Sequence, residues 1–265
     1  MPTPDELHLL QLLCTCQPEN VALAETLAKG LNINLLTLLE SEGFFELGIQ
    51  KIENFEPELL EGDFSRRQMS DLRAICYFPN LKHLDCSNNQ IVDLSPVASL
   101  MNLRELYCTN NQIVDLSPVA NLRNLEILYC NINQIVDLSP VANLINLQYL
   151  SFWDNQIADL LPIINLTNLK ELGSGFNKIM DLSPVANLTK LEKLFCSNNQ
   201  IASLVPVLNL IKLNEFHFEN NQIISLEPLY HLIRLHNLED VRYDNNPVTE
   251  ASVRAFVQVH TLRYF

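Results

Sequence analysis

The chain has 265 residues, of which 48% are hydrophobic, enough to form a sizeable core and to exclude global disorder. Only 6 residues are glycine, which excludes collagen-like and glycine-rich linker classes. The 17 basic residues are outnumbered by 31 acidic ones, and the net charge of −14 disfavours binding to the phosphate backbone of nucleic acids.

The first 58 residues carry no repeat and are predicted to form a small helical cap. Apolar residues recur with helical spacing over 5–14, 18–30 and 33–43. In the middle segment Pro18 lies near the expected start and Gly30 is the expected terminator. This part holds ten acidic residues and two basic ones. We expect it to cover the first coil of the structure that follows, and a separate acidic docking surface is the alternative.

From residue 59 onward the sequence is built from a repeat of 22 residues, with the consensus LxxLxCxxNxIxxLxPxxxLxx. The first leucine recurs at constant spacing, at Leu81, Leu103, Leu125, Leu147, Leu169, Leu191 and Leu213. An eighth copy opens at Leu238, after a three-residue insertion within 231–237. Positions one to twenty-two are counted below from the first leucine of each copy.

The repeat register divides the chain into four parts. We expect an acidic helical N-terminal cap (1–58), a degenerate first repeat (59–80), eight repeats (81–246) and a C-terminal cap (247–265). In the last part Thr249 is the expected N-cap of a helix. That helix is predicted to place three apolar residues on one face, namely Val253, Phe256 and Val257.

The apolar pattern within one copy predicts the fold. Residues at positions four and six alternate with polar or variable ones, which is typical of a short strand with one buried face. Apolar residues at positions eleven, fourteen, seventeen and twenty continue the buried set around one coil. A single coil cannot bury this set, so coils stack and share a core. The prediction is an α/β solenoid with a right-handed coil, a parallel concave sheet and short 3₁₀ turns on the convex side.

Polar columns are predicted to hold the turns together. Position nine is asparagine in all eight copies, where a buried amide can satisfy backbone groups that lack sheet partners. Position sixteen is proline in seven copies, and in four of them the serine before it is expected to N-cap a short turn. Five aspartates at position thirteen, from Asp93 to Asp181, are expected to cap the same turns, with a Ca²⁺ site as the less favoured alternative.

The seven cysteines suit reduced thiols better than disulfides. Four of them occupy the inward position six and are expected to lie in the core: Cys86, Cys108, Cys130 and Cys196. Cys14 and Cys16 form a CxC on a predicted helix, where residues two apart point to different faces. No histidine pairs with a cysteine at metal-ligand spacing, and no phosphate loop or catalytic motif is present. The sequence therefore predicts a non-enzyme with no cofactor and no metal.

The N-terminal residues lack the basic and apolar regions of a secretory signal. No stretch reaches the roughly 18 apolar residues that a membrane-spanning helix needs. Together with the expected reduced thiols, these features favour a cytoplasmic location and no membrane insertion.

The repeat resembles the leucine-rich repeat family, and specifically its 22-residue class. Internalins and the leucine-rich regulatory subunits of protein phosphatase 1 belong to that class. The resemblance covers about 59–265 and rests on seven copies in perfect register, but it leaves the activity open. It implies that ligands bind on the concave sheet. The near-identical copies indicate recent internal duplication, from which we expect a bacterial source.

We therefore expect a non-enzymatic scaffold that binds a protein partner on its concave face. The alternatives are a regulatory subunit of an enzyme such as a phosphatase, and a secreted internalin-like adhesin. Residues at outward positions of the middle copies, six of them aromatic, define the expected site: Tyr107, Ile127, Tyr129, Tyr149, Trp153, Gly173, Gly175, Phe176 and Phe195. Gly173 and Gly175 are expected to leave an open notch between Trp153 and Phe195.

Charged residues are expected to select the partner. The predicted rim of the site consists of Glu105, Asp154, Glu171 and Lys193. Acidic residues toward the C-terminal end are expected to attract a basic surface, namely Glu215, Glu219, Glu239, Asp240 and Asp244. The chain itself is expected to be a monomer, or a weak homodimer in which the rings lie under a neighbouring chain.

Overall fold

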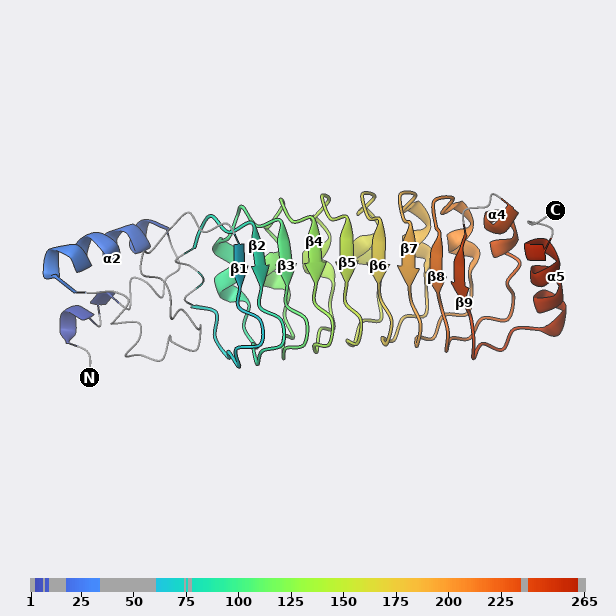
Figure 1. Ribbon diagram of the computed structural model, residues 1–265, viewed down its shortest axis with the longest axis horizontal. Coiled ribbons are helices and arrows are strands. Elements are labelled where there is room, and N and C mark those ends of the chain that lie inside the picture. Colours follow the sequence, from blue (N-terminus) through green and yellow to red (C-terminus); the bar gives the residue numbers. More distant parts are fainter. Residues whose placement is uncertain are drawn as a thin grey trace.

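In this computed structural model the protein is described over residues 3–6, 8–9, 18–33, 61–73, 75, 78–234 and 238–261. One three-residue strand from each coil joins a single parallel sheet, and the strands lie in chain order along the long axis of the molecule (Figure 1). The strands are β1 (Glu61–Asp63), β2 (His83–Asp85), β3 (Glu105–Tyr107), β4 (Ile127–Tyr129), β5 (Tyr149–Ser151), β6 (Glu171–Gly173), β7 (Lys193–Phe195), β8 (Glu215–His217) and β9 (Asp240–Arg242). This architecture confirms the predicted solenoid.

The register of the sheet reproduces the register of the sequence. Each strand covers positions three to five, and in β2 to β5 the central residue is buried between two half-buried ones. Paired residues are 22 apart from β1 to β8, as in Glu61↔His83. Between β8 and β9 the offset is 25, as in Glu215↔Asp240, so the predicted three-residue insertion is absorbed between these two strands.

The asparagine at position nine closes the turn after strands β2 to β9, as predicted. In the coil of β5, the Nδ2 group of Asn155 donates to the carbonyl oxygens of Cys130 (3.1 Å), Phe152 (2.9 Å) and Trp153 (3.3 Å). Its Oδ1 accepts the backbone N–H of Ile135 at 2.9 Å. Since two of these partners belong to the preceding coil, each asparagine ties neighbouring coils together.

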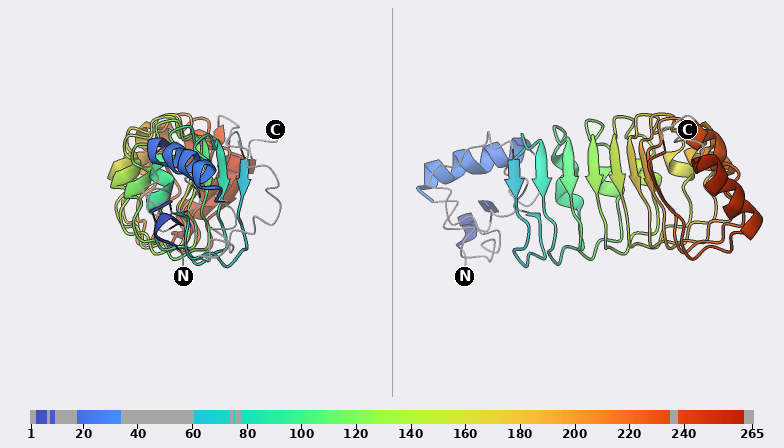
Figure 2. Two further views of the ribbon diagram at one scale, coloured as in Figure 1. Left: turned by 90° about the vertical axis from the view of Figure 1, so that its left-hand side faces the viewer. Right: turned by 45° about the vertical axis from the view of Figure 1, so that its right-hand side comes forward.

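The side opposite the sheet is built from 3₁₀ turns, which end-on lie across the core from the strands (Figure 2). They are η3 (Ser95–Ser99), η4 (Ser117–Val119), η5 (Ser139–Val141), η6 (Leu161–Ile163), η7 (Ser183–Asn187) and η8 (Val205–Asn209). The core between the two layers is one cluster of apolar side chains, and its inward leucines, valines and cysteines are at most 1% exposed in these coils. Short turns in place of helices let the coils stack evenly on this side.

The prediction that serine N-caps these turns was wrong. In η4 the N-cap residue is Leu116, which makes no side-chain cap, and Ser117 is the first residue of the turn. The aspartate two residues earlier acts instead: Asp115 Oδ1 accepts the Ser117 N–H at 2.7 Å, and Oδ2 accepts its hydroxyl at 2.6 Å. The two hydrogen bonds lower the pKa of Asp115, the hydroxyl bond having the larger effect. The aspartate column therefore stabilises the turns, as expected from the sequence.

Helix α2 (Pro18–Leu31) lies in the N-terminal part and contributes Ala24 and Ala28 to the core. Gly30 does not terminate this helix. The chain leaves it at Asn32, which adopts a φ of 56°, and the Ile33 N–H returns to the Ala28 carbonyl at 2.9 Å. The third predicted helix lies outside the described residues apart from Ile33, and so do Cys14, Cys16 and Cys76.

Among the described residues after β8 there are two helices. Helix α4 (Leu229–Arg234) takes the place of a 3₁₀ turn, and α5 (Glu250–Thr261) packs against it. Thr249 Oγ1 accepts the Ser252 N–H at 3.3 Å, as expected of an N-cap. Phe256 is 6% exposed and packs on Tyr243, whereas Val257 is 52% exposed and therefore does not share the buried face that the sequence predicted.

Candidate functional site

The outward face of the sheet, which consists of positions three, five, seven and eight of every coil, is called the sheet face below. Ring contacts on it begin with His83 and Tyr107, whose centroids are 5.2 Å apart. Tyr107 in turn meets Tyr129 edge to face at 5.4 Å. On the neighbouring column Ile127 pairs in register with Tyr149, and the Lys170 ammonium lies 6.0 Å from the Tyr149 ring.

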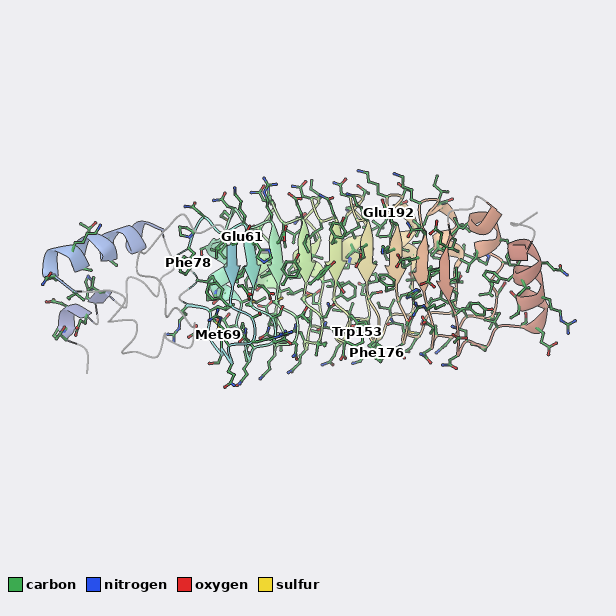
Figure 3. The ribbon with its side chains drawn as sticks, in the orientation of Figure 1. Glu61, Met69, Phe78, Trp153, Phe176 and Glu192 are labelled. Atoms are coloured by element: carbon green, nitrogen blue, oxygen red, sulfur yellow. The ribbon has the colours of Figure 1, made fainter. Side chains whose placement is uncertain are left out.

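A second group of rings lies just beyond the C-terminal ends of β5 and β6 (Figure 3). Trp153 and Phe176 meet edge to face at 4.9 Å, and the Phe176 side chain is 45% exposed. Asn131 of the preceding coil positions this group, since its Oδ1 accepts the Trp153 N–H at 2.8 Å and the Ser151 hydroxyl at 2.6 Å. Sequence reasoning missed Asn131 because its role depends on a hydrogen bond between coils.

The expected open notch at Gly173 and Gly175 is not present. Both glycines are buried. A Cβ atom at Gly175 would lie 2.7 Å from Cδ1 of the Trp153 ring and 3.1 Å from the Ser197 carbonyl oxygen. At Gly173 it would lie 2.3 Å from the Ser151 hydroxyl oxygen. The space that the glycines free is therefore taken by their neighbours, and the absence of a side chain at Gly175 leaves room for the Trp153 ring.

Position eight has left-handed backbone in all nine coils, with φ between 52° and 58°. Five coils place asparagine there, one of the few residues that adopt this conformation easily. The coils of β4 and β6 instead place Ile132 and Phe176 there, both exposed (39% and 45%). For residues of this kind the conformation costs about 1–2 kcal/mol. Ile132 was missed from the sequence, although its departure from asparagine was the available signal.

A third ring contact joins Phe195 and His217 at 4.9 Å. On the sheet face the ring contacts thus form three groups, and Ser151 and Gly173 lie between Tyr129 and Phe195 in the central column. Together with His217, the predicted site residues place ring or aliphatic side chains on six consecutive coils, from β3 to β8.

Two tyrosines on this face, Tyr107 and Tyr129, have a pKa above the ordinary value of a phenol. Partial burial, assisted by the Glu105 carboxylate that accepts the Tyr107 hydroxyl at 3.2 Å, raises the pKa of Tyr107 to about 12. Burial also raises the pKa of Tyr129, and the charge of Glu171 adds to the effect. Both phenols are therefore neutral hydrogen-bonding groups at physiological pH.

Several of the predicted partner-selecting charges are already paired within the chain. Lys193 contacts Glu215 at 2.5 Å, and Asp240 contacts both His217 (2.9 Å) and Arg242 (3.3 Å). These contacts lower the pKa of Asp240, the His217 hydrogen bond having the largest effect. The C-terminal end of the sheet face is consequently less open to a basic partner than the sequence indicated.

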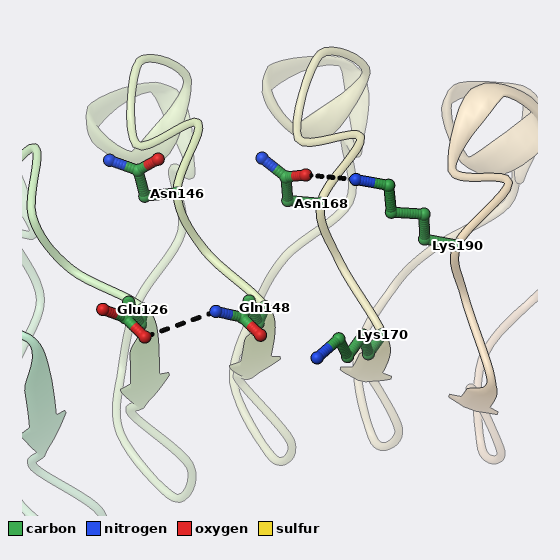
Figure 4. Close-up of a pocket in the computed structure, with 6 residues that line it drawn as sticks. All are labelled: Glu126, Asn146, Gln148, Asn168, Lys170 and Lys190. Carbon is green, nitrogen blue, oxygen red and sulfur yellow. Dashed lines mark hydrogen bonds between the residues drawn. The ribbon is translucent and has the colours of Figure 1, made fainter.

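A polar groove of about 410 Å³ borders the sheet face at the N-terminal ends of β4 to β7 (Figure 4). Its lining residues are Glu126, Asn146, Gln148, Asn168, Lys170 and Lys190. Lys190 Nζ donates to Asn168 Oδ1 at 2.6 Å, and Gln148 donates to Glu126 at 3.3 Å. Groups of this kind form hydrogen bonds and ion pairs with the polar rim of a partner.

Two structural features are absent from the described residues. No group of three or more His, Cys, Asp or Glu side chains in this part of the chain is placed to hold a metal ion. Within the same residues no helix has both the length and the apolar character required to cross a bilayer.

The repeats match a sequence-family model described as Leucine Rich repeats (2 copies) at residues 79–121, 101–143 and 189–231. The structure of internalin C2 from Listeria monocytogenes is similar, with 33% identity, a TM-score of 0.65 and coverage of 72% of this chain and 82% of that one. The chain belongs to the leucine-rich repeat family. A comparison with curated protein sequences gave no match.

Two further structures show how this leucine-rich repeat protein relates to others. Internalin F from Listeria monocytogenes has 28% identity and a TM-score of 0.52, with 81% of this chain and 77% of that one covered. The ectodomain of the Arabidopsis receptor kinase HAESA, solved with a peptide hormone ligand, has 23% identity and a TM-score of 0.63. That comparison covers 70% of this chain and 34% of HAESA, and it shows the shared fold alone.

Proposed function

We propose that this protein is a non-enzymatic module that binds a protein partner on the sheet face between β3 and β8. Leucine-rich repeat families are typically interaction scaffolds, which gives the general class. The observation that supports the location is the pair Ile132 and Phe176, which hold exposed apolar side chains in left-handed backbone where five of the other coils use asparagine. Residues that lower stability without filling the core are characteristic of functional surfaces.

The charge of the sheet face supports a basic partner. Its four positions carry ten acidic residues and three basic ones across the nine coils. Such an excess raises the association rate of a cationic surface and weakens as salt is added. Asp154 lies within the apolar region, next to Trp153, where it would orient a lysine or arginine of the partner.

The test removes the two central rings. Tyr129→Ala together with Trp153→Ala should abolish partner binding and leave the unfolding midpoint nearly unchanged, because both side chains lie on the outward face. The matched control is Met101→Ala with Ile145→Ala, which removes side chains that are 51% and 56% exposed elsewhere on the solenoid. Proteins captured from the source organism would be quantified by mass spectrometry and then tested as purified components. Full binding by the ring variant, or unfolding of it, would contradict the proposal.

A secreted internalin-like adhesin is the second candidate, supported by the similarity to internalin C2. A cytoplasmic scaffold or enzyme-regulating subunit is favoured by the four free thiols that the core encloses. Fractionation of the source cells distinguishes the two, because an adhesin would be recovered from the surface or medium.

A further inference from the structure

A second surface, apart from the sheet face, is formed by position twelve. Seven successive coils place an exposed apolar residue there, and we call this set the apolar stripe: Val92, Val114, Val136, Ala158, Met180, Ala202 and Ile224. The five larger side chains are 47–65% exposed. Since position eleven already supplies the buried isoleucine of each coil, the stripe adds nothing to the core.

The internal copies show that apolar character is maintained at this position while the residue itself changes. Position twelve varies among valine, alanine, methionine and isoleucine across the seven copies. The flanking outward columns are polar: position ten is glutamine in six copies and lysine in one, and position thirteen is aspartate in five and serine in two. A preference for extended backbone does not explain alanine and methionine there. The pattern is that of a surface used for contact.

The surroundings of the apolar stripe are acidic. Positions ten to fifteen of these seven coils contain six carboxylates, five of them in the aspartate column, and Lys178 as the one basic residue. Hydrogen bonds from Ser117, Ser139 and Ser183 lower the pKa of the aspartates in their coils, so these groups stay charged at neutral pH. A second copy of this chain would bring two such columns together, whereas a cationic partner complements them.

The spacing of the stripe favours a helix as the partner. Neighbouring coils lie about 4.8 Å apart, so the six intervals of the stripe span roughly 29 Å. An α-helix of about 19 residues has that length, and its pitch of about 5.4 Å differs from the coil spacing by only about 0.6 Å, so successive turns stay near successive coils over about four intervals. In an extended strand, residues on the same face repeat at about 6.6 Å, so their side chains no longer line up with the coils after two or three coils.

We propose that the apolar stripe docks an amphipathic basic helix of another protein. The aliphatic side chains of that helix would cover Val114, Val136 and Met180, and its lysine or arginine residues would lie along the aspartate column. This surface is independent of the proposed site on the sheet face, so the failure of one proposal would not affect the other.

The probe is a fluorescein-labelled 20-residue peptide of leucine and lysine, with leucines at helical positions i, i+3, i+4 and i+7 so that they share one face. Two control peptides are a scrambled sequence of the same composition and a leucine–glutamate peptide of the same pattern. Fluorescence anisotropy would measure binding to the full chain. We expect the patterned lysine peptide to bind at least about tenfold more tightly than either control.

The decisive variant is Val114→Thr/Val136→Thr/Met180→Gln, and it should bind the patterned lysine peptide at least about tenfold more weakly than the natural chain. The Met101→Ala/Ile145→Ala and Tyr129→Ala/Trp153→Ala variants should bind it normally. Circular dichroism would verify that all three variants have the same unfolding midpoint as the natural chain. If the triple variant is unstable, the single variant Val136→Thr takes its place. Equal binding by the stripe variant, equal binding of a control peptide, or loss in the Tyr129/Trp153 variant would overturn the proposal. Sedimentation equilibrium covers the remaining case, since a dimer that the stripe variant abolishes would assign the surface to self-association.

Discussion

Replacement of Asn155 by alanine measures how much the asparagine column contributes to stability. The three carbonyl oxygens that Asn155 contacts each keep another partner: Asn133 Nδ2 on Cys130 (3.1 Å), Asn177 Nδ2 on Phe152 (3.1 Å) and the Ile132 N–H on Trp153 (2.8 Å). The backbone N–H of Ile135 is the group that loses its acceptor. One buried unsatisfied donor costs about 1–3 kcal/mol, so we expect a loss of about 2 kcal/mol.

The assay is urea unfolding followed by circular dichroism and by fluorescence of Trp153, the one tryptophan of the chain. Asn146→Ala is the matched control, because Asn146 is exposed and makes one hydrogen bond, to the Arg123 carbonyl at 2.8 Å. Its cost should stay within about 0.5 kcal/mol. An Asn155→Ala midpoint equal to that of the natural chain, or of the control, would refute the reasoning.

Asn155→Asp adds a test of the donor function. Aspartate keeps an acceptor for Ile135 but places a carboxylate among three carbonyl oxygens, so its pKa in the folded state is expected to rise above about 3.9. A carboxyl group whose pKa is higher in the folded than in the unfolded state destabilises the fold at high pH. The lost stability is recovered as the pH falls through the folded-state pKa. The variant should therefore be less stable than Asn155→Ala at pH 7.5 and gain stability toward pH 5, unlike the alanine variant.

Three further predictions concern titrating and reactive groups. Burial raises the pKa of the Cys86 and Cys130 thiols to about 12. A thiol-labelling reagent should therefore leave the core cysteines of the native protein unmodified until urea unfolds it. Rapid labelling of Cys86 in the native protein would contradict the assigned register. Subtracting the ultraviolet titration of the Tyr107→Phe variant from that of the natural chain should reveal a phenol that ionises near pH 12. Glu105→Gln should lower the pKa of Tyr107 only partly toward its ordinary value, because burial contributes more to the shift than the Glu105 carboxylate does. Because the pKa of Asp115 is lowered in the folded state, the ionised carboxylate stabilises the fold above about pH 3.8, its ordinary pKa, and this contribution is lost as the pH falls. The Asp115→Asn variant should therefore lose less stability than the natural chain between pH 5 and 3. Parallel stability curves for the two proteins would contradict this role.

The repeat period made most of the fold predictable, because one pattern of apolar residues fixes the strand, the turn and the stacking of every coil at once. The errors lie where two local signals compete. Ser117-Pro118 resembles an N-cap followed by a first-turn proline, yet Asp115 reaches the Ser117 N–H first and leaves the serine inside the turn. At the end of α2 it is Asn32 that adopts the left-handed conformation, although glycine, present at Gly30, is the residue type that most often ends a helix.

The candidate site was predictable by position but not by contact. The repeat register alone places Tyr107, Tyr129 and Trp153 on the outward face of the sheet. It does not show that the Trp153 ring covers Gly175, because that depends on a side-chain rotamer and on a hydrogen bond from the neighbouring coil. Backbone conformation at position eight is likewise absent from the apolar pattern, so the strain at Ile132 emerged only from its φ of 52°.

The reach of the asparagine column has an evolutionary consequence. Each of these side chains bonds within its own coil and to the coil before it, as Asn133 does with Cys130 and Cys108. These hydrogen bonds therefore connect each coil only to the coils directly before and after it. A gene rearrangement that removes 22 codons would join two coil surfaces that are already complementary. Loss of residues 104–125 would bring Leu103 directly before Glu126, in register. Length, and with it the spacing between the ring groups, can thus change by unequal recombination in steps of one coil, while the fold requires no compensating substitution.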